Sequence, residues 1–273
     1  MIYHFDKSAS VSLVQITDCH VHNEREQLLS GVNTHDSLGQ VIDGIRAAGP
    51  APDMVLVTGD LTHEGDERAY RLLLSQLERL PAPYFWLPGN HDHLAPMASI
   101  GSEQRLRTKQ IILPHWQILL VDSHVEDEVA GLVAQSELTW LATALREQPD
   151  KYAAIFVHHP LLPVGCDWLD PQRIANAEQL LTLFDNTPQL RLVCNGHVHQ
   201  EWQQERQHYW LLSTPSTCIQ FKSNSVDYAE DDFPPGYRRF TLHTDGSFDT
   251  EVMRVGELVR VAGAPRGYGG DYN

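Results

Sequence analysis

The sequence predicts an α/β fold in which two mixed β-sheets pack face to face and helices cover their outer sides. Over the first two thirds of the chain, short apolar runs that end in turn residues alternate with amphipathic helical patterns, which is typical of β-α-β units. Over the last third, strand-like runs follow one another without long helices between them. The combination favours mixed sheets over purely parallel or purely antiparallel ones.

The predicted strands of the first part are short apolar runs bounded by turn residues. They lie at residues 11–17, 53–58, 84–87, 153–157 and 190–194, and residues 110–113 and 116–121 form a predicted hairpin.

The predicted helices between these strands carry apolar residues at three- and four-residue spacings. Their ranges are 35–48, 66–80, 136–146 and 176–185. Pro81 ends the second helix, because proline cannot continue the helical hydrogen bonding. Asn176 and Gln179 have the spacing of a capping pair at the start of the fourth helix.

The last third is predicted to be mostly β-structure in the same domain. Its predicted strands lie at residues 209–212, 217–221, 237–242 and 247–253. The polar, acidic stretch 223–236 is expected to be a surface loop or lid. Because no long linker interrupts the chain, we expect residues 1–262 to form one domain and the Gly-rich residues 263–273 a mobile tail.

The charge of the chain argues against several classes of partner. Its 36 acidic residues against 20 basic ones give a net charge of -16. Such a chain is a poor candidate for binding nucleic acid or an anionic membrane, since both depend on Lys and Arg. No apolar run approaches the roughly 18 to 20 residues of a membrane span. Residues 1–10 lack signal-peptide features, and the four cysteines form no Cys-x-x-Cys pair, so we expect a cytoplasmic protein.

Polar residues that bind metals follow five of the predicted strands. In open α/β sheets the carboxyl ends of the strands line the ligand crevice, so these residues are expected to lie together. The candidate ligands are Asp18, His20, Asp60, Asn90, His158, His197 and His199.

The spacing of these residues supports the same interpretation. Asp18 and His20 are two residues apart, as are His197 and His199. On a helix such pairs would point about 200° apart, whereas in extended chain both side chains face the same side. A glycine directly precedes Asp60, Asn90 and His197, which permits tight turns and close backbone approach.

Seven candidate ligands are too many for one zinc ion, which takes three or four protein ligands. They suit two ions that share a carboxylate. Nitrogen and oxygen ligands without thiolate favour Mn, Fe, Co or Zn over Ca or Mg alone. Any one of these residues by itself is more often a turn cap or an ordinary polar residue, but five such blocks in order favour a metal site.

The remaining histidines and the cysteines fall into two groups. His22, His93 and His159 neighbour the cluster in sequence and could support it. Cys19 and Cys194 are expected to be small buried residues. The other histidines have no such context and are expected to play no part in the site: His4, His35, His63, His115, His124, His208 and His243.

The five blocks resemble the calcineurin-like metallophosphoesterase superfamily. Its pattern is Asp-x-His, Gly-Asp, Gly-Asn-His-Asp/Glu, His and Gly-His-x-His, and its fold is a four-layer pair of mixed sheets flanked by helices. Within it the chain is most similar to the bacterial class III cyclic-nucleotide phosphodiesterases, and this similarity extends to residues 158–166, 215–221 and 235–238.

The resemblance implies a role for each site residue. One metal would take Asp18, His20, Asp60 and His199, and the other Asp60, Asn90, His158 and His197, so that Asp60 bridges. His91 would be the catalytic acid that protonates the leaving oxygen. The substrate would also contact His20, Asp60, Asn90, His91 and His199.

The resemblance also implies the reaction. The expected substrate is 3',5'-cyclic AMP, hydrolysed to 5'-AMP by a hydroxide that bridges two divalent ions. Fe and Mn are the expected metals, with Mg, Co or Zn as alternatives. The sequence leaves the base specificity and the oligomeric state open.

Other functions remain as alternatives. The same metal core serves enzymes for other phosphodiesters, 2',3'-cyclic nucleotides or phosphomonoesters, and a non-catalytic scaffold can share the fold. Residues 61–66 lack the Asp-Arg-Gly of the protein serine/threonine phosphatases, which weakens that interpretation. The early His-x-His-x-Asp-His run of the metallo-β-lactamases is absent from the sequence.

Overall fold

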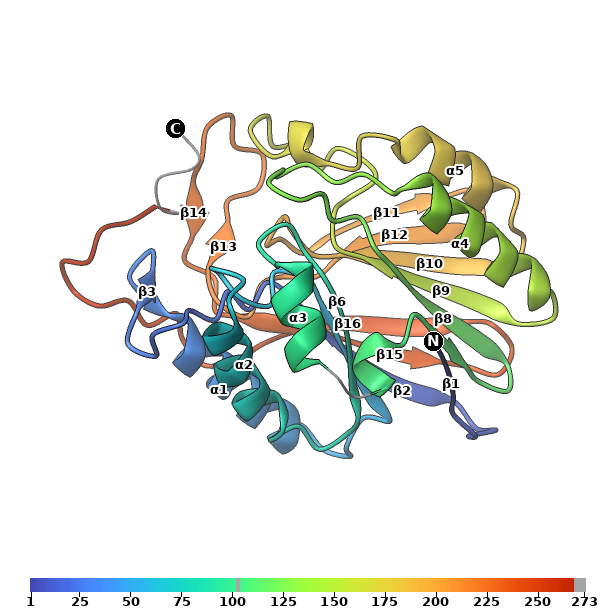
Figure 1. Cartoon of the computed structure of the whole chain (residues 1–273), viewed down its shortest axis with the longest axis horizontal. Helices are drawn as coiled ribbons and strands as arrows, with labels where there is room; N and C mark the ends of the chain where they lie inside the picture. Colours follow the sequence, from blue (N-terminus) through green and yellow to red (C-terminus); the bar gives the residue numbers. More distant parts are fainter. Residues whose placement is uncertain (102–103, 268–273) are drawn as a thin grey trace.

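Two mixed β-sheets face each other and build the centre of this chain, as the sequence predicts (Figure 1). The computed structural model describes residues 1–101 and 104–267. One sheet has seven strands in the order β1-β7-β8-β9-β10-β12-β11, and the other has five in the order β16-β15-β2-β5-β6. Each sheet is mixed: β8, β9, β10 and β12 run parallel in the larger sheet and β2, β5 and β6 in the smaller one, while β7–β8, β12–β11, β16–β15 and β15–β2 pair antiparallel.

The strand bounds agree closely with the apolar runs of the sequence. In the seven-stranded sheet they are β1 (Ile2–His4), β7 (Gln110–Ile112), β8 (Trp116–Val121), β9 (Tyr152–Val157), β10 (Leu190–Asn195), β12 (Tyr209–Ser213) and β11 (Trp202–Arg206). In the five-stranded sheet they are β16 (Phe248–Arg254), β15 (Gly236–Leu242), β2 (Val11–Ile16), β5 (Met54–Thr58) and β6 (Tyr84–Leu87).

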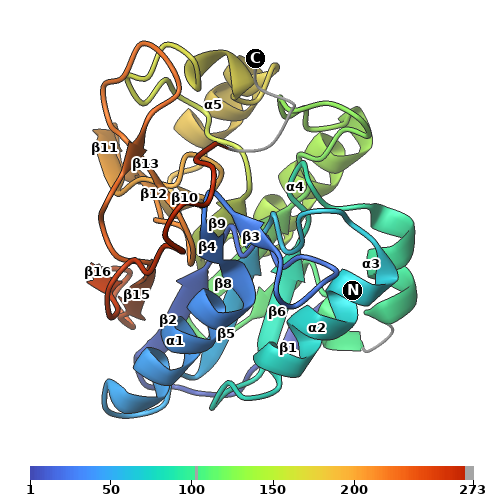
Figure 2. The ribbon, with the colours of Figure 1, turned by 90° about the vertical axis from the view of Figure 1, so that its left-hand side faces the viewer.

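Helices cover the outer face of each sheet and complete four layers (Figures 1 and 2). The apolar stripes of α1 (Thr34–Ala47) and α2 (Glu67–Leu77) pack on the five-stranded sheet. Those of α4 (Gln135–Glu147) and α5 (Ala177–Asp185) pack on the seven-stranded sheet. The short helix α3 (Leu94–Ile100) and the 3-10 turns η1 (Gln104–Arg107) and η2 (Asp170–Gln172) lie in connecting segments.

The structure corrects three details of the sequence prediction. Of the predicted strand 217–221 only β13 (Gln220–Phe221) forms, and it pairs with β14 (Glu230–Asp231), so the predicted loop 223–236 contains a strand. The side chain of Asn176 does not cap α5; its amide instead exchanges hydrogen bonds with the backbone of Val133. The edge strands β1 and β11 and helix α3 were not predicted.

The C-terminal segment of the described chain lies against a small hairpin. Strands β3 (Leu28–Leu29) and β4 (Val32–Asn33) form this hairpin, and Val261 N–H donates to the Gly31 carbonyl at its turn. Residues 268–273 of the predicted tail lie outside the described residues, so the boundary at residue 262 stays a prediction. Within residues 1–101 and 104–267, no helix combines the length and the apolar character that a bilayer crossing requires.

A buried polar group links the two sheets just beneath the carboxyl ends of their strands. Gln15 of β2 is fully buried and faces the otherwise apolar layer between the sheets. Its amide donates to Thr58 Oγ1 at 2.8 Å, and its oxygen accepts from Thr214 Oγ1 at 2.6 Å. The bond to Thr58 lies within the five-stranded sheet, whereas the bond to Thr214, just after β12, crosses to the seven-stranded sheet and ties the two together with no unpaired polar atom on Gln15.

We therefore expect Gln15→Leu to destabilise the fold. Leucine removes both hydrogen bonds and leaves the buried hydroxyl of Thr214 without its acceptor, which costs about 1–3 kcal/mol. The measurement is the free energy of unfolding in urea. Gln204→Leu is the matched control, because Gln204 is exposed on β11. Equal stability of the two variants would show that the hydrogen bonds of Gln15 are not needed.

Candidate metal centre

The carboxyl ends of parallel strands from both sheets meet at one edge of the sandwich. β2, β5 and β6 run parallel in one sheet, and β9 and β10 run parallel in the other. The segments that follow these five strands carry all seven predicted ligands, and the structure brings their side chains into one cluster. These ligands are Asp18, His20, Asp60, Asn90, His158, His197 and His199.

Three of the residues assigned to the first metal lie within reach of one ion. Asp18 Oδ1 is 3.4 Å from His199 Nε2, and His20 Nε2 is also 3.4 Å from His199 Nε2. All three side chains are buried. The ligand atoms of this group lie within 4.8 Å of one another, which suits a single ion between them.

The residues assigned to the second metal lie directly beside this group. His197 Nδ1 is 3.0 Å from Asn90 Oδ1, and the rings of His158 and His197 have centroids 5.3 Å apart. His158 Nε2 lies 4.0 Å from Asp18 Oδ1 of the first group. The two groups are therefore neighbours in one site.

Asp60 lies between the two groups. Its Oδ2 is 3.5 Å from His20 Nε2 on one side and 3.3 Å from His158 Nε2 on the other. Its Oδ1 accepts a hydrogen bond from the backbone N–H of His91 at 2.9 Å. This is the position that a carboxylate shared by two ions would need.

The orientation of the imidazoles suits metal binding. The Nδ1–H of His158 donates to the Thr58 carbonyl at 3.0 Å, and that of His199 donates to the Ile219 carbonyl at 2.9 Å. Each bond fixes the tautomer in which Nε2 carries a lone pair directed at the carboxylates, as in metal-binding histidines generally. Nε2 of His158 is buried and faces Asp60 Oδ2 at 3.3 Å, so a cation shared with that carboxylate could bind there.

Burial and charge shift the pKa values of these groups. Burial lowers the pKa of His20 and His197 well below the ordinary value, so both are neutral, which is the form that binds metals. Burial opposes the charged form of His158, but the Asp60 carboxylate outweighs it and raises the His158 pKa to about 9. Burial would raise the pKa of Asp60, but the charges of His158 and His91 hold it below its ordinary value.

The backbone conformation at the ligands differs from the prediction. The two-residue spacing was expected to place each pair in extended chain, but Asp18, His20, His197 and His199 all have positive φ, between 43° and 65°. Asp60 has φ 46° as well. The side chains of each pair converge because both residues adopt the left-handed conformation in the turn after the strand, which non-glycine residues occupy only at a cost.

Two of the glycines make room for the ligands. A Cβ at Gly89 would lie 2.3 Å from Asp60 Oδ1 and 2.8 Å from His158 Nε2. Gly59 has φ 89°, and a Cβ there would lie 2.3 Å from His158 Nδ1. Side chains at either position would occupy the space that the ligands need.

Asp92 ties the two ligand loops of the five-stranded sheet together. Its Oδ2 accepts from the backbone N–H groups of Gly89 and Leu61, and its Oδ1 accepts from the hydroxyl of Tyr70. Burial, followed by the nearby charge of Asp60, raises the pKa of Asp92 to about 7. The carboxyl group is thus a structural anchor for the loop that carries Asn90.

Sequence reasoning missed His63, which the structure places inside the site. Its ring stacks on His91 with centroids 5.0 Å apart and planes at 20°, and its Nδ1 is 3.4 Å from His20 Nδ1. Burial and the charges of His91 and His22 lower the pKa of His63 to about 4, so its ring is neutral at pH 7. Its sequence position, three residues after Asp60, was the one available signal.

The other residues near the cluster differ in their contacts. His159 is buried with its ring 4.8 Å from that of His197, and its Nε2–H donates to the Val129 carbonyl. His22 lies next to His63, with ring centroids 4.6 Å apart. The side chain of His93 is half exposed and faces Glu126, while its backbone N–H donates to the Tyr70 hydroxyl that bonds Asp92. Cys19 and Cys194 are buried, as predicted.

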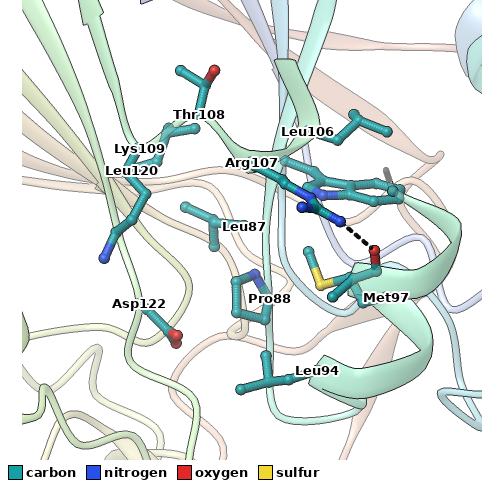
Figure 3. A pocket seen from close by; sticks show the side chains of 13 residues that line it. Leu87, Pro88, Leu94, Met97, Leu106, Arg107, Thr108, Lys109, Leu120 and Asp122 are labelled. Carbon is teal, nitrogen blue, oxygen red and sulfur yellow. Dashed lines mark hydrogen bonds between the residues drawn. The ribbon is translucent and has the colours of Figure 1, made fainter. Parts of the chain in front are cut away.

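A well-formed apolar pocket elsewhere contains none of the predicted site residues. It has a volume of about 260 Å³ and lies between β6, α3 and β8. Figure 3 shows the apolar side chains of Leu87, Met97 and Leu106 around it, with Asp122 at its edge. The chemistry of the chain is therefore concentrated at the polar cluster rather than in this apolar cavity.

Comparison with known proteins gives the family. Residues 11–201 match the model of the calcineurin-like phosphoesterases. The 3',5'-cyclic adenosine monophosphate phosphodiesterase CpdA of Escherichia coli K12 is 36% identical over 251 residues, which cover 91% of each chain. The 3',5'-cyclic-nucleotide phosphodiesterase alr5338 of Nostoc is 35% identical over 246 residues, covering 90% of this chain and 92% of that protein.

Solved structures share the fold at low sequence identity. A dimetal phosphatase from Danio rerio superposes with a TM-score of 0.63 at 15% identity, over 91% of this chain and 100% of that one. GAP50, the anchor in the inner membrane complex of Plasmodium, superposes with a TM-score of 0.60 at 11% identity, over 92% of this chain and 90% of that one. The four-layer sandwich, the converging strand ends and the match over residues 11–201 together show that this chain belongs to the calcineurin-like phosphoesterase family.

Proposed function

We propose that this protein hydrolyses 3',5'-cyclic AMP to 5'-AMP with a pair of divalent metal ions. The observation that carries the proposal is the carboxylate of Asp60, which faces an imidazole of each ligand group at 3.5 and 3.3 Å. Relatives named as cyclic-AMP phosphodiesterases, similar over about nine tenths of this chain, support the choice of substrate.

We assign the ligands as two sets that share one residue. Asp18, His20, Asp60 and His199 would hold one ion, and Asp60 with Asn90, His158 and His197 would hold the other. When bound, such ions supply positive charge that attracts the phosphate and lower the pKa of coordinated water toward 7. This explains how a chain of charge -16 could bind an anionic substrate, because its own carboxylates would otherwise repel it.

We assign His91 as the general acid. The Nδ1–H of His91 donates to the His63 carbonyl at 3.3 Å, so Nε2 is the atom that exchanges a proton with substrate. Hydrolysis adds water to phosphorus and breaks its bond to the 3' oxygen, which leaves as a hydroxyl after taking a proton from His91. His20, Asp60, Asn90 and His199 border the same space and are proposed to contact the phosphate.

Fe and Mn are the metals we propose, because the donor set is imidazole, carboxylate and amide without thiolate. Mg, Co or Zn remain the alternatives. We also propose a cytoplasmic location. The four cysteines are unpaired in the structure, as expected in a reducing compartment.

The proposed function first predicts metal dependence and a preferred substrate. Removal of metal with a chelator should abolish turnover of cyclic AMP, and Mn²⁺ or Fe²⁺ should restore it with 5'-AMP as the product. Chromatography of the reaction mixture measures both the turnover of cyclic AMP and the formation of 5'-AMP. Cyclic GMP, 2',3'-cyclic AMP and a chromogenic diester serve as comparison substrates. Faster turnover of one of these would reassign the substrate, and no turnover of any of them by metal-loaded protein would favour a scaffold.

The second prediction concerns the shared ligand. Asp60→Ala should lose both ions, because the carboxylate belongs to both ligand sets. Metal content per chain, measured by mass spectrometry of the metals after dialysis, gives the answer. Asp150→Ala is the matched control, since Asp150 is exposed and outside the site. A variant of Asp60 that keeps two ions would contradict the shared assignment.

The third prediction concerns the acid. His91→Ala should keep both ions and lose about 10²- to 10⁴-fold in kcat on cyclic AMP, as expected for loss of a general acid. The loss should be much smaller on a p-nitrophenyl diester, whose leaving group needs no proton. Equal losses on both substrates would remove His91 from this role.

A further inference from the structure

His63 contacts two of the proposed functional histidines from the loop that follows Asp60. Its backbone N–H donates to the Val21 carbonyl, which joins this loop to the loop after β2. As a result its ring packs against both His20 and His91, whose own rings also touch edge to face with centroids 4.8 Å apart. His63 is neither a proposed metal ligand nor the proposed acid, so the proposed reaction gives it no role.

The proposed metal ligands show why the contact with His20 matters. His158 and His199 each place Nε2 toward the carboxylates and donate Nδ1–H to a backbone carbonyl. His20 also places Nε2 toward the cluster, 3.5 Å from Asp60 Oδ2. Its Nδ1, however, faces the Nδ1 of His63 at 3.4 Å. The His63 ring therefore takes the place that a backbone carbonyl has beside Nδ1 of His158 and of His199.

The contact with His91 is of a different kind. The two rings stack with centroids 5.0 Å apart and an angle of 20° between their planes. The carbonyl of His63 also accepts from His91 Nδ1–H. Stacking limits rotation of the His91 ring about its side-chain bonds, while the carbonyl selects the tautomer that leaves Nε2 toward the site.

Neighbouring residues hold the His63 ring itself. His22 packs against it with centroids 4.6 Å apart and planes at 59°. Nδ1 of His22 lies 2.5 Å from Glu64 Oε1, and Glu64 Oε2 accepts from the backbone N–H of Asn23. The His63 ring is therefore supported by residues that are not proposed metal ligands, as a positioning residue requires.

We propose that His63 is a positioning residue with two separable contacts: its Nδ1 accepts the Nδ1–H of His20, and its ring face holds His91 in the orientation for proton transfer. The proposal rests on the function proposed above, since it takes His20 as a ligand and His91 as the acid. Its two parts make different predictions, because one concerns metal affinity and the other concerns the leaving group.

Two substitutions separate the contacts. His63→Phe keeps a flat ring against His91 but removes the acceptor for His20. His63→Asn can keep an acceptor near the position of Nδ1 but removes the stacked ring. Metal affinity is measured without substrate, by competition with a coloured chelator, and kcat and KM are measured for cyclic AMP and the p-nitrophenyl diester. His115→Phe and His115→Asn are matched controls, because His115 is exposed on the turn between β7 and β8.

We expect opposite patterns from the two variants. His63→Phe should lose about 10- to 100-fold in metal affinity, the effect of removing the hydrogen-bond partner of a metal ligand. Once saturated with metal, it should keep its kcat ratio between the two substrates. His63→Asn should keep metal affinity within about threefold of the wild type, and should lose about tenfold in kcat on cyclic AMP with KM and the diester rate little changed, because only proton transfer is affected.

The results that would overturn the proposal are equally distinct. Unchanged metal affinity in His63→Phe contradicts the contact with His20, and an unchanged kcat ratio in His63→Asn contradicts the contact with His91. Equal losses in both variants, with lowered unfolding midpoints in urea, would reduce His63 to a structural residue. If wild-type protein binds two ions but does not hydrolyse cyclic AMP, the proposed function fails, while the affinity of His63→Phe still decides the first contact.

Discussion

The close approach of buried carboxylates and imidazoles is the constraint on which the rest of this structure depends. Asp60 contacts imidazoles from both sheets, one on the loop after β2 and one at the end of β9. The contact forms only if the sheets pack so that these strand ends meet. The inter-sheet layer, with Gln15 beneath the site, sets that alignment. Left-handed ligand residues and the bare backbone of Gly89 then allow the final approach.

The same approach creates an electrostatic cost that bound cations would offset. Asp18, Asp60 and Asp92 are all buried, and the charge of Asp60 acts on Asp92, in a chain of net charge -16. This electrostatic cost raises the pKa of Asp92, and the neighbouring carboxylates raise the pKa of His158 to about 9. Protons alone would have to supply the missing positive charge in the absence of metal. Divalent ions supply it more effectively, so metal binding and stability of the site are expected to be linked.

Much of the fold, and the clustering of the seven candidate ligands, could be predicted because both depend on local sequence patterns. Apolar runs mark the central strands, and the polar residues that follow them mark the site, since parallel strand ends share an edge. What could not be predicted depends on contacts between distant segments. Nothing in the local sequence distinguishes His63 from other histidines, because its place in the site depends on the contact between the loop after β5 and the loop after β2. Asn176 has a capping pattern, but the backbone of Val133 competes for its amide. The left-handed backbone conformation of the candidate ligands also depends on contacts between distant segments, which residue spacing alone does not predict.

Fold similarity alone does not determine what such a sandwich does. At TM-scores of 0.63 and 0.60, a dimetal phosphatase and a membrane-complex anchor are about equally similar to this chain. The discriminating information is in the side chains at the strand ends and in how they are oriented. Here two of the four proposed ligand histidines, His158 and His199, are oriented by backbone carbonyls, which almost any sequence supplies. The other two face side chains: His20 faces His63, and His197 faces Asn90 and Gln172. A side-chain partner can be changed by a single substitution without moving the backbone. The loop that carries His63 is therefore one place where a single substitution could adjust the proposed metal site, because the His63 ring contacts both the proposed ligand His20 and the proposed acid His91.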